Sequence, residues 1–573
     1  MPVYPLLHAN NYSSLFPKDG TQGESVSASV DDKLKICKRL VAFQVDYVEA
    51  GWPGSNPKDA SFFERAQTEL THQEQQRISA FGSTRRKNIQ VQDDAQVQAL
   101  LDSKAPSICI VAKAHHWQVT EILKATPEEN LAMIRDTVEY LVSHGRRVMV
   151  DLEHFFDGYQ FDSAYALQCC EAAANAGASC LVLCDTNGGS MPWKVGEMCR
   201  AIVDHFRGQV TIGIHCHNDC GMAVANSVMA VQNGVGLIQG TINGIGERTG
   251  NADLCSIVPS LALHGNSQMT CKDQLKELTG LSRYVDEILN RKPLSSAPFV
   301  GASAFAHKGG LHVAAMDRSP MSYQHIQPEL VGNEKRILIS ELSGRQNILD
   351  KITQVGVDLG EKATNERAIA ILNRVKQLEA KGYTFEGAEA SVHLMILHMT
   401  EGYCPPFRVL DYAANVYDSN MDSASRVVAG NTRNGSGPTA RATVKVRTIR
   451  RSKEGEQVDW NALPYEDRLE VSDGNGPVDA LAGALLRALK QTHPSLEQVE
   501  LVDYKVRILD PETATGATTR VMIEFHDKVK DTTWTTVSVD TNVISASLNA
   551  LVDGFEYALI EHAESCMLCD DEY

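Results

Sequence analysis

Short runs of β-forming residues alternate with helical patterns through the first half of the chain. The runs fall at residues 45–51, 78–82, 108–112, 148–152, 180–185, 210–215 and 237–242. Strands separated by helices in this way pair in parallel, and an eighth strand before residue 30 would close the sheet. The pattern predicts an α/β fold with a (β/α)8 TIM barrel over residues 1–290. The first strand would be unusual, because His8 to Ser14 is a polar run and Pro17 follows it.

The alternation stops after about residue 290. Residues 340–397 have a mainly helical pattern, and Asn431, Gly435 and Pro438 indicate a loop. Beyond it, alternating strands at 442–447, 503–508, 520–525 and 533–539 are interleaved with amphipathic helices at 480–489 and 545–560. We expect a helical linker subdomain over residues 291–424 and a separate C-terminal α+β domain over residues 425–573. No internal repeat is evident.

Composition narrows the functional classes. The 573 residues include 54 Lys and Arg against 72 Asp and Glu, a net charge of −18, which argues against nucleic acid or an anionic membrane as the main partner. No apolar run approaches the length of a membrane span, and the first twenty residues resemble neither a secretory signal nor a transit peptide. The 14 cysteines show no regular framework. We therefore expect a cytoplasmic protein.

The most specific chemical signal is a pair of histidines at a predicted strand end. His215 and His217 are two residues apart, and because side chains alternate along a strand they point the same way. Two ligands of one metal must do the same. About thirty residues later, residues 243–251 form a polar, glycine-rich stretch ending in Asn251, which could close over the site. The two motifs together favour a metal site at the carboxyl end of the barrel strands.

Several motifs together resemble a known enzyme family. Residues 19–22, 49–54, 151–158, 185–188, 215–219 and 246–251 resemble the acyl-CoA condensing barrel family of isopropylmalate, homocitrate and citramalate synthases. The resemblance extends over nearly the whole chain. Residues 381–390 and 472–480 resemble the long citramalate synthases of this family, and the second segment lies in the family's C-terminal allosteric domain.

The resemblance implies a Claisen-type condensation of acetyl-CoA with pyruvate, followed by thioester hydrolysis, giving citramalate and CoA. It also implies a divalent cation, Mg²⁺, Mn²⁺ or Zn²⁺, which would polarise the keto group of the 2-oxo acid. By resemblance the metal ligands are Asp19, His215 and His217, with Asn251 as a further candidate. The cofactor set is thus one cation, with acetyl-CoA as co-substrate.

Further site residues and partners also come from the resemblance. It places Glu153 in the catalytic centre and Thr186 at the substrate carboxylate, and it assigns His312 and Tyr323, from the partner chain's following subdomain, to proton transfer around acetyl-CoA. A homodimer or larger assembly is implied, with isoleucine as an end-product effector of the C-terminal domain.

The chain departs from the family at its first strand. Lys18 precedes Asp19 where the family has an arginine, so Lys18 is the candidate for a catalytic and substrate-binding cation here. The exchange replaces a planar fork of donors with one flexible ammonium, which is not conservative. We expect weakened activity as a consequence.

Two alternatives remain open at this stage. One is isopropylmalate or homocitrate synthase activity on a larger 2-oxo acid, which pocket size near Phe81, Leu152 and Thr186 would decide. The other is a catalytically weakened or silent relative, which only the altered first strand supports.

Overall fold

A computed structural model describes residues 11–14, 23–24, 26–265, 267–356, 361–400, 403–417, 440–449, 465–510, 512 and 516–562. The chain divides into two compact units. The first is Met1–Phe305 together with Gln324–Lys335, and the second is Ala306–Tyr323 together with Arg336–Tyr573. Lys18 and Asp19 lie outside the described residues.

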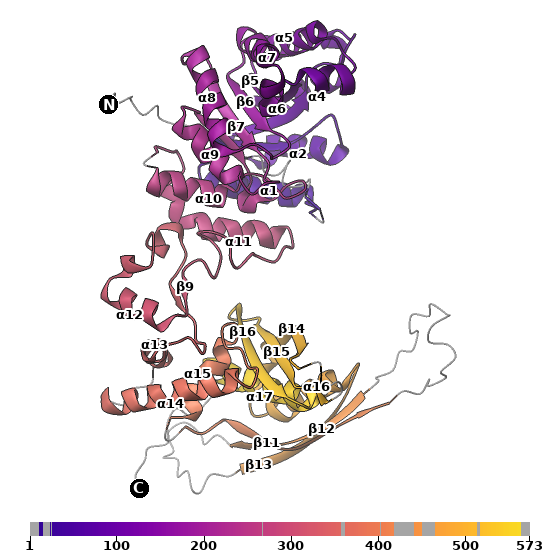
Figure 1. Cartoon of the computed structure of the whole chain (residues 1–573). Helices are drawn as coiled ribbons and strands as arrows, with labels where there is room; N and C mark the ends of the chain where they lie inside the picture. Colours follow the sequence, from indigo (N-terminus) through magenta and orange to yellow (C-terminus); the bar gives the residue numbers. More distant parts are fainter. Residues whose placement is uncertain are drawn as a thin grey trace. The chain divides into compact units, whose positions relative to one another are not determined.

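The first unit contains a closed eight-stranded parallel barrel, as predicted (Figure 1). Its strands are β1 Asn11–Ser14, β2 Tyr47–Gly51, β3 Ile78–Ser83, β4 Ser107–Lys113, β5 Arg147–Glu153, β6 Cys180–Asp185, β7 Thr211–Cys216 and β8 Leu237–Gly240. Within the polar run that predicts a poor central strand, Asn11–Ser14 does form β1, which pairs in parallel with both β2 and β8. Closure gives this short strand two neighbours, so its backbone pairing outweighs its weak local propensity.

Helices follow the strands and cover the outside of the barrel. They are α1 Val30–Ala42, α2 Pro57–Glu69, α3 His72–Gln75, α4 Ala95–Asp102, α5 Pro127–Ser143, α6 Phe155–Phe161, α7 Ser163–Asn175, α8 Pro192–Phe206, α9 Ala223–Gln232, α10 Leu254–Pro259 and α11 Leu278–Ile288.

Strand alternation separates two cores, one inside the barrel and one between strands and helices. On β5, Val150 and Leu152 belong to the large outer core, whereas Met149 belongs to the interior cluster with Phe81. Of the residues expected to size the substrate pocket, Leu152 therefore faces the helices. Phe81 lies inside the barrel, where it makes an edge contact with Trp52 at 5.5 Å between ring centroids.

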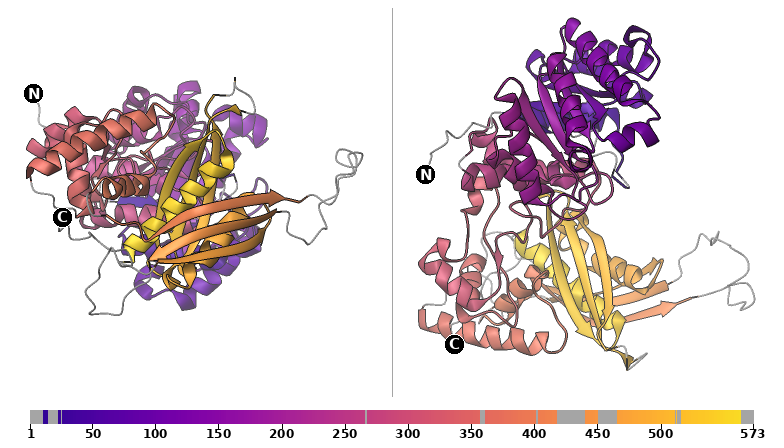
Figure 2. Two further views of the ribbon diagram at one scale, coloured as in Figure 1. Left: turned by 90° about the horizontal axis from the view of Figure 1, so that it is seen from below. Right: turned by 45° about the horizontal axis from the view of Figure 1, so that its top comes forward.

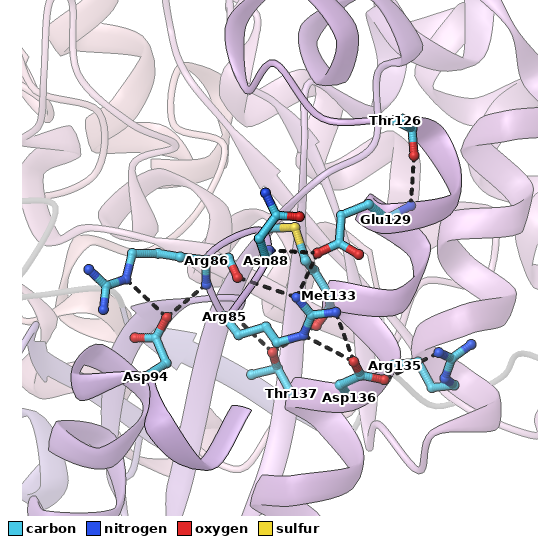
Figure 3. A network of polar contacts seen from close by, with 10 residues as sticks. All are labelled: Arg85, Arg86, Asn88, Asp94, Thr126, Glu129, Met133, Arg135, Asp136 and Thr137. Carbon is cyan, nitrogen blue, oxygen red and sulfur yellow. Dashed lines mark hydrogen bonds and ion pairs between the residues drawn. The ribbon is translucent and has the colours of Figure 1, made fainter. Parts of the chain in front are cut away.

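The segment after β3 is held to helix α5 by a buried arginine (Figure 3). Arg85 donates to Glu129 at 2.8 Å and to Asp136 at 2.9 and 3.0 Å, and its backbone N–H donates to the Thr137 hydroxyl at 2.9 Å. Two carboxylates compensate the cost of burying the guanidinium. The network fixes one loop at the C-terminal face of the barrel.

The second unit begins with the linker elements. These are β9 Ala306–His307, α12 Gly310–Arg318, β10 Arg336–Ile337, α13 Arg345–Val355, α14 Glu361–Glu379 and α15 Glu389–His398. The predicted helical character of residues 340–397 is confirmed. A hydrophobic cluster that includes Ile348, Ile371 and Phe385 holds these helices together.

The rest of this unit is built from two consecutive β-β-β-α repeats (Figure 2). The first comprises β11 Phe407–Val416, β12 Ala440–Ile449, β13 Tyr465–Gly474 and α16 Pro477–Lys490; the second comprises β14 Val499–Ile508, β15 Thr519–Asp527, β16 Thr532–Asp540 and α17 Val543–Glu561. No internal repeat was evident from the sequence, but the order of strands and helices repeats here. Sequence alternation did not identify β11 and β13, so the first repeat could not be recognised.

The predicted domain boundaries at residues 290 and 424 remain predictions. β11 precedes residue 425, yet it pairs antiparallel with β12. The predicted loop around Asn431 lies outside the described residues.

Helix α17 is, by length and composition alone, apolar enough to cross a membrane, contrary to the expectation from the sequence. Its apolar side packs against β15 and β16, and Leu548, Leu551 and Phe555 are buried there. These residues recur at the spacing of one helix face. The helix thus has the environment of a core helix in its domain.

Candidate active site

The two predicted metal-binding histidines lie together at the carboxyl end of β7. His215 is buried, and its ring centroid is 5.2 Å from that of His217. Two imidazoles that bind one ion at about 2.1 Å per nitrogen place their ring centres roughly 5 Å apart. The backbone N–H of His217 donates to the Asp185 carbonyl at the end of β6, at 3.2 Å, which fixes its position. This donor set fits a divalent cation.

Asn251 joins the histidines from the glycine-rich stretch after β8. It forms an isolated antiparallel bridge with His217, and its Nδ2 lies 3.4 Å from His215 Nε2. Position 246 favours glycine, because a Cβ there would lie 2.1 Å from Asn251 Oδ1 and would displace that side chain. Gly250 has φ of +99°, which favours glycine. The predicted closure of this stretch over the histidines is therefore seen.

Glu153 lies at the end of β5, beside the end of β4. Its carboxylate is 2.5 Å from the Lys113 ammonium, and both side chains remain about a quarter exposed, at 27% and 23%. The strand register places the two residues opposite each other. The sequence analysis did not identify Lys113. The feature that could have identified it is a lone cation at the end of an otherwise apolar barrel strand.

Thr186 is tied to the residue after Glu153. Its hydroxyl oxygen accepts a hydrogen bond from the backbone N–H of His154, which has φ of 57°. Burial lowers the pKa of His154, and this favours the neutral imidazole. Because the hydroxyl oxygen accepts in this contact, its own proton remains available for another acceptor.

Arg248, which the sequence analysis did not identify as a site residue, lies at the same end of the barrel. Arg248 donates to both Asp219 oxygens, at 2.8 and 2.9 Å, and to the Thr186 carbonyl at 2.9 Å. The hydrogen bond from Arg248 lowers the pKa of Asp219. Both residues fall within the motifs recognised from sequence, but their pairing depends on the loops meeting in space.

Among the described residues, a second group of potential metal ligands lies inside the barrel. Ligand atoms of Glu49, Cys109 and Asp151, all buried, lie within 4.8 Å of one another. Burial, with neighbouring carboxylates, raises the pKa of the Cys109 thiol well above its ordinary value. The histidine pair, unlike this group, lies at the carboxyl end of the barrel strands, where barrel active sites lie, so it is the better candidate for a catalytic cation site.

The last two predicted residues belong to the second unit. His312 on α12 and Tyr323 lie with their rings stacked, 4.2 Å between centroids, and both are exposed. The structure thus brings together His215, His217 and Asn251 in one unit and His312 with Tyr323 in the other.

Three protein families match successive parts of the chain. Residues 12–285 match the HMGL-like family, residues 299–382 the homocitrate synthase post-HMGL domain-like family, and residues 413–559 the LeuA allosteric (dimerisation) domain. Among solved structures, the HMG-CoA lyase of Bacillus subtilis has a TM-score of 0.44 at 22% identity, covering 52% of this chain and 98% of that one.

The similar curated proteins match along almost their full length. The (R)-citramalate synthase of Aquifex aeolicus is 42% identical over 96% of this chain and 98% of that protein. Those of Geobacter sulfurreducens and Synechocystis are 41% and 43% identical, covering 96% and 95% of this chain and 97% and 94% of theirs. This chain belongs to the (R)-citramalate synthase family.

Proposed function

We propose that this protein condenses acetyl-CoA with pyruvate and water to give citramalate and CoA. The observation that carries the proposal is identity of 38–43% to five (R)-citramalate synthases over almost the whole chain, with the histidine pair placed at the carboxyl end of a closed barrel. Active sites of such barrels lie at that end.

The cation site is assigned to His215 and His217, with Asp19 and Asn251 as further ligands. Mixed imidazole and oxygen ligation suits Mg²⁺, Mn²⁺ or Zn²⁺. When bound, the cation supplies Lewis acidity to the keto oxygen of the 2-oxo acid. The buried, hydrogen-bonded setting of His215 supports this assignment.

Thr186 and Glu153 are assigned to the 2-oxo acid. The Thr186 hydroxyl donates to the substrate carboxylate while its oxygen accepts from His154, so a single rotamer serves both contacts. The Lys113 ammonium holds Glu153 in place. In this assignment Glu153 lies beside the keto group, whose carbon forms the new carbon–carbon bond.

His312 and Tyr323 are assigned to acetyl-CoA. One of them removes a proton from the acetyl methyl group, whose carbon then attacks the keto carbon of pyruvate. Water finally cleaves the thioester carbon–sulfur bond and the thiol of CoA leaves. Stacking of the two rings supports their acting as a pair. The family resemblance assigns this pair to the active site of the partner chain.

Lys18 is assigned the role of the family's arginine, which is to bind the negative charge of the substrate. Its single ammonium offers no bidentate contact, so we expect a lower kcat/KM than an arginine would give. A protein that has lost activity is the competing interpretation. The other catalytic and metal-binding candidates, Glu153, His215, His217, His312 and Tyr323, are all present. Their presence argues against a loss of activity.

A homodimer is proposed from the second unit. β14 exposes a row of apolar side chains, and the matched LeuA domain is described as a dimerisation domain. The exposed residues are Leu501, Val502, Tyr504, Val506 and Ile508. Such a row on a sheet edge favours association with a second copy.

We further propose isoleucine as the effector of this domain, a cytoplasmic location, and domain boundaries at residues 290 and 424.

The test is release of free thiol from acetyl-CoA with a panel of 2-oxo acids. With Mg²⁺ or Mn²⁺ present, kcat/KM should be higher for pyruvate than for 2-oxoisovalerate or 2-oxoglutarate. Omission of the oxo acid gives the background hydrolysis. A higher kcat/KM for either larger acid would instead identify an isopropylmalate or homocitrate synthase.

A further inference from the structure

A buried glutamine links the candidate metal ligand His215 to polar groups inside the barrel. Gln239 on β8 is 1% exposed and lies opposite His215 in the strand register. Its Oε1 is 2.9 Å from His215 Nδ1, and its Nε2 is 2.9 Å from Asp151 Oδ1. A buried amide is costly unless both ends are hydrogen-bonded, and here both ends are used.

The direction of the amide follows from its contact with Asp151. The Cys109 thiol also donates to Asp151 Oδ1, at 3.0 Å, so two donors meet at one carboxylate oxygen. Reversing the amide would place its carbonyl oxygen against that carboxylate oxygen, which is repulsive. The amide nitrogen must therefore face Asp151, and the carbonyl must face His215.

The consequence for His215 is a defined tautomer. A carbonyl oxygen can only accept, so Nδ1 of His215 carries the proton and donates to Gln239. Nε2 then carries the lone pair, on the side of the ring that faces Asn251. A neutral imidazole binds a metal through such a lone pair, and the hydrogen bond at its other nitrogen decides which nitrogen that is.

We propose that Gln239, oriented by Asp151, is a positioning residue that presents Nε2 of His215 to the divalent cation. The inference rests on the proposed role of His215 as a metal ligand. Packing alone does not call for glutamine here, because the cluster inside the barrel includes large apolar residues such as Phe81, Met149 and Leu237.

The experiment measures binding of Mn²⁺ alone by calorimetry, using the full-length protein after chelator treatment and without substrates. Gln239→Leu removes both hydrogen bonds, and Gln239→Asn keeps an amide that is too short to span both partners. Each should weaken Mn²⁺ binding roughly 10- to 100-fold. Cys109→Ala leaves Gln239 bound to both partners, so its Mn²⁺ affinity should stay within about threefold of the unaltered protein.

Met149→Leu, in the same interior cluster, is the matched control for packing. The metal-free Gln239→Asn protein should remain folded and unfold in a single cooperative transition, as Met149→Leu does, so that a loss of Mn²⁺ binding is not a loss of the fold. If both Gln239 variants bind Mn²⁺ as tightly as the unaltered protein, Gln239 is not a positioning residue. If the unaltered protein binds no Mn²⁺, the metal site and this inference both fail.

Discussion

The hydroxyl oxygen of Thr186 accepts a hydrogen bond from the backbone N–H of His154 at 2.8 Å, joining the ends of β5 and β6. His154 has left-handed backbone angles, which are unfavourable for a residue with a side chain. The contact therefore fixes the turn that immediately follows Glu153. One hydroxyl thus supports the position of a catalytic candidate.

Replacing Thr186 by valine should lower kcat/KM for pyruvate roughly 10- to 100-fold. A hydrogen bond to a charged group contributes about 1.5–3 kcal/mol, and each 1.36 kcal/mol corresponds to about tenfold in rate. Thr186→Ser keeps the hydroxyl and should stay within about threefold of the unaltered protein. The measurement is thiol release over a range of pyruvate concentrations. Equal activity of the valine and serine variants would show that the hydroxyl has no role.

His217→Ala should abolish turnover and Mn²⁺ binding while leaving the fold intact, because His217 lies at the rim of the barrel. Chelation of the unaltered protein should give the same loss, and added Mg²⁺ or Mn²⁺ should restore activity. His205→Ala, at an exposed histidine of α8, is the matched control. Activity of the His217→Ala protein after exhaustive chelation would exclude the metal from the reaction.

Isoleucine should inhibit the enzyme and raise its melting temperature, because a ligand that binds only the native state stabilises it. Leucine at the same concentration serves as the comparison. The intact chain is the appropriate sample, since truncation at residue 425 would leave β11 without its partner β12. Absence of both inhibition and a thermal shift would argue against isoleucine as the effector.

Glu129→Gln should destabilise the protein at neutral pH but not in acid. The hydrogen bond from Arg85 lowers the pKa of folded Glu129 below its ordinary value of 4.5. The stabilisation is thus fully present above that ordinary value and is lost as pH falls through the lower folded value. At pH 7 we expect a melting temperature lower by about 2–4 °C, equivalent to roughly 1 kcal/mol.

Glu128→Gln is the matched control, because Glu128 is an exposed neighbour in the same first turn of α5. Its effect should be small at both pH values. A deficit of Glu129→Gln that persisted below pH 3 would mean that the Arg85 ion pair is not its cause.

Local sequence patterns were sufficient for the barrel and for part of the site. Strand and helix periodicity extends over many residues, so the alternation from residue 45 to 242 could be recognised without contacts. His215 and His217 are neighbours along one strand, and their shared direction follows from the pleat alone. Strands β11 and β13 were not predicted from the sequence. Most of their residues are exposed to solvent, so apolar and polar residues do not alternate regularly along them.

Local patterns of residues were therefore enough to predict the order of the elements and the side chains that share one strand end. Which groups from different strands meet depends on the folded arrangement. Lys113 beside Glu153, Arg248 beside Asp219, and Gln239 between His215 and Asp151 are pairs far apart in the chain. Their contacts depend on closure of the barrel and on the register of its strands, which no local pattern of residues encodes.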